Sequence, residues 1–526
     1  MSRPLSFIRA ACRNPTALLV LAAGLIAFAV QSGELGSADS QRRLQATHAL
    51  WTSAPQVLPQ DYPEFGIRGR NGKLQTWYGI GQSLLMLPSD ILGTWIEGWP
   101  VFADYNGNDP SVRVVVVSYT VSIFLNVATA LVALCFFLQL GFTRSHSIAG
   151  CLALLILTTH LHYTQNLMEN NYICLLTLAG FTWQYRWLLT GSRRALFIGS
   201  AAFGLNLLTR LTTGMDLLAG ALFIALSIWF ARVRGTEFLR RARTYAAVTI
   251  PVYAVFIALD RIYQYYRFGS IFNTYAGIAA RAWRAQNPNL PADFPFSAPF
   301  HSGFFGALFS PAKSIFLFDP LLVLMLILAA AAWRRFSGAV KAYIIATAFM
   351  LFAYISFYAR YFTFAGDTAW GDRYAATTVE LTALLAVPLL LQFWRELRNP
   401  VRALGAVLIA ASAAVQIASV AFWQSLERYQ VESLHLPDFV LGLRFENIVA
   451  FALGKMNAWG LVNPHITDDA WDYQHITSWN LLPFQLKHAG VAPLWVDRFA
   501  LILWWVSLAA LAWTLLRLHR LLLNSR

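Results

Sequence analysis

Charged residues are scarce in this chain. Aspartate, glutamate, lysine and arginine make up 13% of its 526 residues, whereas hydrophobic residues make up 57% and the mean hydropathy is +0.50. A soluble domain carries about 25% charged residues. The composition therefore excludes an ordinary soluble globular protein.

Cysteine is also rare, with only Cys12, Cys135, Cys151 and Cys174 in the chain. Three of them lie within apolar runs and Cys12 lies in the basic N-terminal segment. Their spacing matches neither a disulfide framework nor a standard metal motif. We therefore expect all four to be small packing residues.

Long apolar runs are abundant instead. Runs of about 18 or more apolar residues are typical of transmembrane helices. We therefore predict an all-α polytopic membrane protein with about twelve transmembrane helices. The predicted spans are 15–31, 113–140, 146–163, 170–189, 194–209, 212–232, 243–265, 316–334, 339–358, 375–394, 401–422 and 496–518.

Two segments are open to another interpretation. The first run, Pro15 to Val30, follows a basic stretch and could be a signal peptide. The many later spans, and the lack of a small-x-small cleavage pattern, favour an uncleaved first helix. The segment 80–97 is apolar but contains Pro88, Asp90 and Gly93, so we expect it to be interfacial or re-entrant.

The positive charges indicate the orientation of these spans. With the N-terminus inside, the inner segments hold 21 of the 40 Lys and Arg residues but only two of the 26 acids, Glu237 and Glu396. Basic inner loops follow the positive-inside rule. We predict a multi-pass protein of the inner or cytoplasmic membrane with both ends in the cytoplasm. The net charge of +14 does not indicate nucleic-acid binding, because it is spread over many short loops.

The outer segments differ greatly in length. Three of them, about 32–112, 266–315 and 423–495, are too long to be simple connectors. Long loops often carry functional residues. We divide the chain into a membrane module (1–422), a long extracytoplasmic loop (423–495) and a last transmembrane helix with a basic tail (496–526).

An amphipathic helix is expected directly after the first span. From Ser40 onward, Leu44, Thr47 and Leu50 recur at helical spacing, as in a helix that lies in the membrane interface. Asp39 would then lie at the membrane surface. Helix capping is an equally good explanation for this residue.

Six short motifs lie on the predicted outer face. They are Tyr78 to Leu85, the hairpin Tyr163 to Asn171, Leu208-Thr209-Arg210, Tyr266 to Ser270, Phe309 to Lys313 and Trp370 to Tyr374. Together with the acid and the amphipathic helix of the first outer loop, this series resembles the GT-C superfamily of lipid-carrier-dependent glycosyltransferases, related to protein mannosyltransferases and aminoarabinose transferases. The resemblance covers roughly residues 10–395. It departs from the family in the first loop, where two neighbouring acids are usual and only Asp39 and the more distant Glu34 are present.

The resemblance implies transfer of a sugar from a polyprenyl phosphate to an acceptor hydroxyl. A carboxylate must then accept the hydroxyl proton. We take Asp39 as the first choice and Glu169 as the second carboxylate, which could orient the acceptor or help to hold a divalent cation. Glu169 could equally be an ordinary loop acid. Asp372 is a weaker candidate, because Arg373 beside it should lower its pKa.

Cations should bind the leaving phosphate. Arg210, Lys313 and Arg373 are predicted on the outer side near a membrane boundary, where the positive-inside rule makes cations unusual. Snorkelling to lipid headgroups is the alternative for each of them. The other candidates for the site are Glu34, Arg267, Arg360, Tyr78 and Trp370. We expect Arg42 and Arg43 on the solvated face of the interfacial helix.

Several other polar residues carry weaker signals. His160 and His162 are expected to be wet or hydrogen-bonded, and Asp216 and Glu380 fall within spans. Intramembrane acids are often functional, but both could lie shallow enough to face an outer cavity. A group of acids and histidines late in the chain matches no standard ligand pattern and suggests a solvated loop: His465, Asp468, Asp469, Asp472 and His475.

The sequence supports three functions. The first is a glycosyltransferase, expected to be inverting, whose acceptor is a glycan, a glycolipid or a protein of the cell envelope. The second is a transporter or flippase of lipid-linked sugars, which predicts inverted repeats that the sequence does not display. The third is a non-catalytic envelope-assembly protein, in which Asp39, Arg210 and Arg373 would be replaceable.

Overall fold

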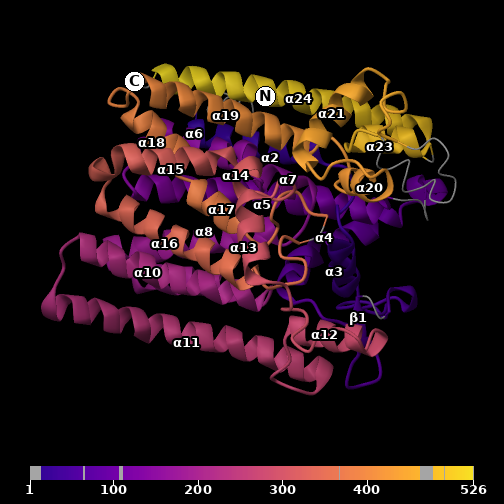
Figure 1. Cartoon of the computed structure of the whole chain (residues 1–526), viewed down its shortest axis with the longest axis horizontal. Helices are drawn as coiled ribbons and strands as arrows, with labels where there is room; N and C mark the ends of the chain where they lie inside the picture. The colour runs from indigo at the N-terminus through magenta and orange to yellow at the C-terminus, as the bar shows by residue number, and fades with distance from the viewer. Residues whose placement is uncertain are drawn as a thin grey trace, which may run out of the picture.

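The computed structural model describes residues 14–62, 65–105, 110–366, 368–462, 478–490 and 492–524. The described chain is almost entirely helical (Figure 1). Its one sheet is a short antiparallel hairpin of β1 (Gly66–Arg68) and β2 (Leu74–Thr76), in which Gly66 pairs with Thr76.

Every predicted span coincides with a helix or a pair of helices. These are α2 (Pro15–Val30), α5 (Val112–Gln139), α6 (Arg144–Leu157) with α7 (His160–Gln165), α8 (Asn170–Thr190), α9 (Arg193–Leu207), α10 (Gly214–Phe230), α11 (Gly235–Phe268), α15 (Pro320–Ala332), α16 (Gly338–Tyr358), α17 (Ala376–Ala383) with α18 (Ala386–Phe393), α19 (Asn399–Ser419) and α24 (Leu494–Asn524). Within the described ranges, seven helices are long and apolar enough to cross a membrane, and α2 and α6 are shorter apolar helices. The predicted class, an all-α polytopic membrane protein, is confirmed.

Shorter helices occupy the long segments between the spans. They are α3 (Ala38–His48), α4 (Gly81–Glu97), α12 (Tyr275–Gln286), α13 (Phe300–Phe309), α14 (Ile315–Phe318), α20 (Leu426–Ser433), α21 (Val440–Ala452) and α23 (Leu482–Ala489). Four 3-10 turns join them: η1 (Pro59–Asp61), η2 (Pro100–Tyr105), η3 (Leu211–Thr213) and η4 (Trp333–Arg335).

The long helices lie side by side, with α11 along one edge of the bundle and α24 along the opposite edge (Figure 1). In the middle, α8 packs against α9 and α10 packs against α16. Their shared core is aromatic, because Phe136, Phe181, Phe223 and Tyr343 are all completely buried and in edge or tilted contact. The edge helices are mostly uncovered by protein, as expected for surfaces that face lipid.

The segment 80–97 forms one helix, α4, despite Pro88 within it. Its buried Asp90 accepts hydrogen bonds from the indole of Trp51 (2.7 Å) and the ring of His48 (3.0 Å). These contacts tie α4 to the end of α3. One oxygen of this acid is therefore hydrogen-bonded inside the protein, and the other lies 3.6 Å from the guanidinium of Arg113.

Candidate active site

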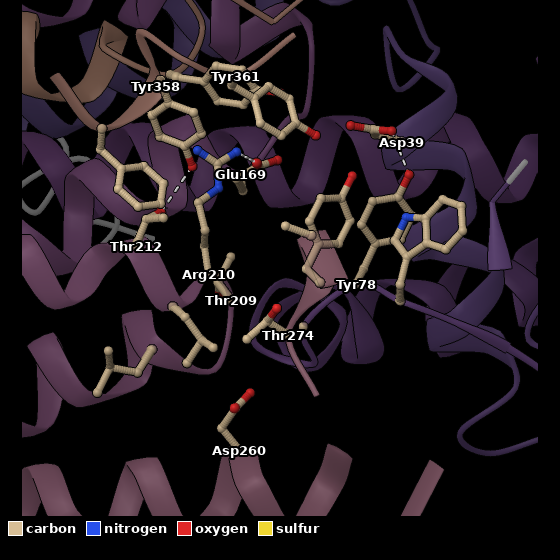
Figure 2. A pocket seen from close by; sticks show the side chains of 18 of the residues that line it. Asp39, Tyr78, Glu169, Thr209, Arg210, Thr212, Asp260, Thr274, Tyr358 and Tyr361 are labelled. Atoms are coloured by element: carbon tan, nitrogen blue, oxygen red, sulfur yellow. Dashed lines mark hydrogen bonds and ion pairs between the residues drawn. The ribbon is translucent and has the colours of Figure 1, made fainter. Parts of the chain in front are cut away.

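A cavity of about 270 Å³ lies where α3, the α9–α10 turn, α11 and α12 come together. Five of the six charged groups in its wall converge from four separate segments: Asp39, Arg43, Glu169, Arg210 and Arg373. Figure 2 shows Asp39 beside Tyr78 on one side of the cavity, the Arg210–Glu169 pair on another, and Asp260 of α11 below.

Helix α3 supplies the first two groups. Its N-cap is Ser37, whose hydroxyl accepts the backbone N–H of Ser40, so Asp39 is not the capping residue. Residues four apart share a helix face, and Asp39 and Arg43 therefore both point into the cavity. The prediction of a solvated Arg43 is wrong, since its exposure is only 5%. Arg42 instead forms an ion pair with Asp61.

Glu169 lies at the centre of the ionic cluster. This residue precedes α8 and is completely buried, and its two carboxylate oxygens accept hydrogen bonds from Arg43 and Arg210. Arg373 is 3.5 Å from the oxygen that Arg210 contacts. One buried acid thus gathers three guanidinium groups, which compensate its loss of hydration.

Asp39 is the more accessible of the two acids, with a side chain 21% exposed. It accepts hydrogen bonds from the hydroxyl of Tyr78 and from Arg373, both at 2.5 Å. Burial acts to raise the pKa of Asp39, but Arg373, Arg43 and the Tyr78 hydroxyl outweigh it and hold this pKa below its usual range. Asp39 therefore stays ionised, and it keeps the pKa of Arg373 above its ordinary value despite burial.

Tyrosine rings hold the guanidinium groups in place. Arg43 lies over the ring of Tyr78 at 4.5 Å and Arg210 over the ring of Tyr374 at 5.3 Å. The ring of Tyr374 in turn stacks on Tyr358 with centroids 4.1 Å apart. Such cation–π contacts favour charged groups in partly dry sites, so the cluster is preorganised.

Two of the sequence motifs pack directly against each other. The N–H of Gly81 donates to the carbonyl of Leu208 at 2.9 Å. A Cβ added at Gly79 would lie 2.3 Å from that same carbonyl oxygen, so this contact requires glycine. The close approach brings Tyr78 and Arg210 to one cavity.

Arg267 has a structural role in this arrangement. It is 1% exposed and donates to the carbonyls of Thr76 and Tyr78. It does not line the cavity. The candidate phosphate ligand from the sequence therefore fixes the loop that carries Tyr78.

Other predicted site residues lie outside the cavity. Lys313 donates to the carbonyl of Ala369 at 2.5 Å. Trp370 is buried against His162 and Phe318. Glu34 is buried but does not line the cavity, and Arg360 pairs with Asp293 on the exposed surface.

Asp372 stabilises the turn before α17, and its burial corrects the expectation for its pKa. Its Oδ1 accepts the N–H groups of Tyr374 and Ala375 (3.0 and 3.1 Å) just before α17. Burial raises the pKa of Asp372 to about 6, against the lowering effects of those N–H groups and Lys313. The neighbouring Arg373 points instead toward Asp39.

A second cavity, of about 570 Å³, shares one wall with the first. The shared residues include Asp39, Tyr78, Arg373 and Tyr374. Its remaining wall is rich in aromatic and amide side chains, mostly from α12 and the loops that follow: Trp283, Gln286, Asn287, Phe294 and Phe362. Outside the shared wall, the first cavity is bounded by aliphatic and aromatic side chains that include Leu207, Leu211, Phe296 and Phe357.

A divalent cation does not fit the two acids as they are arranged. Both oxygens of Asp39 and both oxygens of Glu169 accept hydrogen bonds from Tyr78, Arg373, Arg43 or Arg210. Oxygen ligands of hard cations must be available to the metal. The chemistry below therefore uses these residues without a metal.

The polar residues of the spans do not face either cavity. His160, His162, Asp216 and Glu380 are buried and line neither. The predicted solvated group around Asp468 lies outside the described residues.

Cavity residues that the sequence did not indicate are Arg43, Tyr275 and Tyr358. The spacing of Arg43 from Asp39 was the one available signal. Tyr275 and Tyr358 had none, because their approach depends on helices far apart in the chain. Tyr374 ends the Trp370 to Tyr374 motif, but no role was predicted for it.

No family model matches the sequence, and no curated protein matches it. A crystal structure of the Archaeoglobus fulgidus oligosaccharyltransferase in the apo form is 12% identical, with a TM-score of 0.46, over 85% of this chain and 60% of the other. Its complex with Zn and sulfate gives 12% identity and a TM-score of 0.43 over 87% and 60%. The chain thus spans 60% of the length of those structures. Likeness at this level identifies neither the family nor the activity of this chain.

Proposed function

We propose that this chain is a GT-C-type glycosyltransferase that moves a sugar from a polyprenyl phosphate to a cell-envelope acceptor on the outer face of the cytoplasmic membrane. The observation that carries the proposal is the pair of cavities that meet at Asp39 and Arg373. A reaction between a lipid-borne donor and a separate acceptor needs two compartments with the reacting groups at their junction.

The first cavity suits the donor. Its apolar wall can accommodate the start of a prenyl chain, and Arg210 and Arg373 can bind the phosphate. Helix α11 has 34 residues, about 51 Å, which exceeds a hydrocarbon core of about 30 Å. Asp260, near its C-terminal end, lines this cavity, consistent with a site at the membrane interface.

The second cavity suits the acceptor, because aromatic rings and amides are the groups that hold a polar glycan or a peptide. The acceptor oxygen attacks the anomeric carbon and the bond from that carbon to the phosphate oxygen breaks. The phosphate keeps the electron pair, and Asp39 takes the hydroxyl proton. A single displacement of this kind inverts the anomeric configuration.

Arg373 links the two events. In the resting site this guanidinium pairs with Asp39 and lowers its pKa. A donor phosphate competes for the same guanidinium, so donor binding should raise the pKa of Asp39 and make it a better base. Glu169, already paired with Arg43 and Arg210, acts as a positioning residue.

Donor binding can be measured without knowing the sugar. The purified chain in nanodiscs is titrated with a sugar-free polyprenyl phosphate, and Arg373→Gln is compared with Arg360→Gln, an exposed arginine outside both cavities. We expect roughly tenfold or greater loss of affinity only for Arg373→Gln. Equal affinity in both variants would remove the phosphate from this cavity.

Transfer itself is tested with a panel of polyprenyl-phosphate sugars and envelope acceptors. We expect Asp39→Asn to lower turnover by about 10²–10⁴-fold while carrier binding persists, and Asp293→Asn to have no effect. Full turnover in Asp39→Asn would exclude it as the base. A product of retained configuration would exclude the single displacement.

A further inference from the structure

We propose that His160, Cys174 and Glu380 form a zinc site inside the helix bundle, separate from the candidate active site. The three side chains are completely buried, and one ligand atom from each lies within 4.8 Å of the other two. They come from α7, α8 and α17. None of them lines either cavity.

The strongest evidence is a pair of polar atoms that face each other and have no hydrogen-bond partner among the described residues. These atoms, Nδ1 of His160 and Oε2 of Glu380, are 3.7 Å apart. Nε2 of His160 lies 3.1 Å from Oδ1 of Asn126, an acceptor, so the ring proton belongs on Nε2. Nδ1 is then a lone pair directed at a carboxylate oxygen, an arrangement that needs either a proton or a metal ion between them.

The distance and the surrounding contacts fit a metal ligand set. Zinc binds imidazole nitrogen and carboxylate oxygen at about 2.0–2.2 Å, so two such ligands at a tetrahedral centre lie about 3.4 Å apart. A ligating histidine usually donates its other N–H to an oxygen, as Nε2 does here. The other oxygen of Glu380 accepts from the hydroxyl of Thr159 at 3.1 Å, which orients the carboxylate.

The charges also favour zinc. A thiolate at Cys174 and a carboxylate at Glu380 would balance the charge of Zn²⁺, with His160 neutral. An isolated buried carboxylate is costly. Nitrogen, sulfur and oxygen ligands together are typical of zinc, whereas Mg²⁺ and Ca²⁺ prefer oxygen alone. Binding deprotonates the thiol, and its proton leaves to solvent before the bundle closes.

The site would brace the helices that carry the ionic cluster. Cys174 is five residues after Glu169, and Glu380 is seven residues after Arg373. Helix α8 packs against both α7 and α17. A metal that joins all three would fix Glu169 and Arg373 relative to each other.

The full chain is expressed in medium with Zn²⁺ or, separately, Co²⁺, so that the metal enters during folding, and metal content is measured by mass spectrometry after purification. We expect about one metal per chain, with a thiolate-to-Co²⁺ charge-transfer band in the near ultraviolet. Cys174→Ser should abolish the band, whereas Cys151→Ser, another completely buried cysteine outside the cluster, should retain it.

Glu380→Gln keeps the shape of the side chain and serves where Cys174→Ser fails to fold, as judged by gel filtration. We expect it to lose most of the metal while remaining monodisperse. The proposal is overturned if wild type carries no metal from either medium, which would leave a shared proton between His160 and Glu380. It is equally overturned if Cys174→Ser and Glu380→Gln both retain the metal.

Discussion

At the scale of single residues, the ion pair with Arg373 keeps Asp39 ionised. Asp39 becomes a better proton acceptor only when this ion pair breaks. The two side chains are 2.5 Å apart, and the hydroxyl of Tyr78 donates to the other carboxylate oxygen at the same distance. In this arrangement the Asp39 carboxylate is therefore a weak base. Its reactivity depends on what competes for the guanidinium.

This arrangement predicts the pH dependence. Because the folded pKa of Asp39 lies below 3.8, lowering the pH from about 7 to about 4 should leave it ionised, and kcat/KM should show no acid limb from this group. The ion pair's contribution to stability is likewise present above the unfolded pKa and lost only as the pH falls through the lower, folded one.

In Arg373→Gln, the main influence that lowers the pKa of Asp39 is gone. Burial then raises this pKa, so the acid limb of kcat/KM should appear at a higher pH. Profiles of kcat/KM for the donor report the free enzyme, so comparing them between the two proteins tests this. An acid limb at the same pH in both would contradict the pairing.

Arg42 and Arg43 offer a matched pair on one helix turn. Arg43 contacts Glu169 inside the cavity, whereas Arg42 contacts Asp61 away from it. We expect Arg43→Gln to lower turnover and unfolding temperature together, because a buried Glu169 loses a partner at a cost of about 3–5 kcal/mol. Arg42→Gln should leave turnover unchanged. If Arg42→Gln and Arg43→Gln lowered turnover and unfolding temperature by the same amounts, both arginines would contribute only to general stability.

At the scale of elements, the site depends on one close contact between the Tyr78 loop and the turn after α9. Gly79→Ala should push the loop from the carbonyl of Leu208, since the added Cβ would lie at 2.3 Å. We expect turnover to fall at least tenfold with a smaller change in unfolding temperature. Gly214→Ala, where no atom lies within 4 Å of the added Cβ, should behave like wild type. Similar turnover in the two variants would show that the contact is not needed.

The elements differ in how far the sequence could predict them. The spans were predictable, because apolar runs of sufficient length must be helical in lipid. The helix after the first span was also predictable from the spacing of its apolar residues, although its cap, Ser37, was not singled out. The orientation of Arg43 was not predictable, because its partner Glu169 lies 126 residues away. Motif order also placed Lys313 and Trp370 in the site, whereas Lys313 donates to the carbonyl of Ala369, Trp370 is buried, and neither lines a cavity. Chain proximity to Arg373 does not decide which way a side chain points.

At the scale of the whole molecule, α11 connects the two faces of the bundle. Its basic N-terminal end lies at the α10–α11 turn, and its other end meets α12 beside the candidate site (Figure 1). The predicted orientation puts the first end in the cytoplasm and the second outside.

Single cysteines can test this orientation in a chain whose native cysteines are replaced. Thr236→Cys and Asn289→Cys are both on exposed positions, near opposite ends of α11. A membrane-impermeant maleimide should label Asn289→Cys in intact spheroplasts and Thr236→Cys only after lysis. The reverse pattern would place the candidate site in the cytoplasm and overturn the proposed donor orientation.

The shared wall between the two cavities has a consequence for how such a molecule could diversify. Outside the shared wall, the first cavity includes residues of α9, the turn after it, α11 and α16, whereas the second includes residues of α12 and the loop after it. Substitutions at Trp283, Asn287 or Phe362 can therefore change the shape of the second cavity and leave Arg210 and its neighbours in the first unchanged. A new substrate could therefore be accommodated in one cavity at a time, while the residues of the other cavity stay the same.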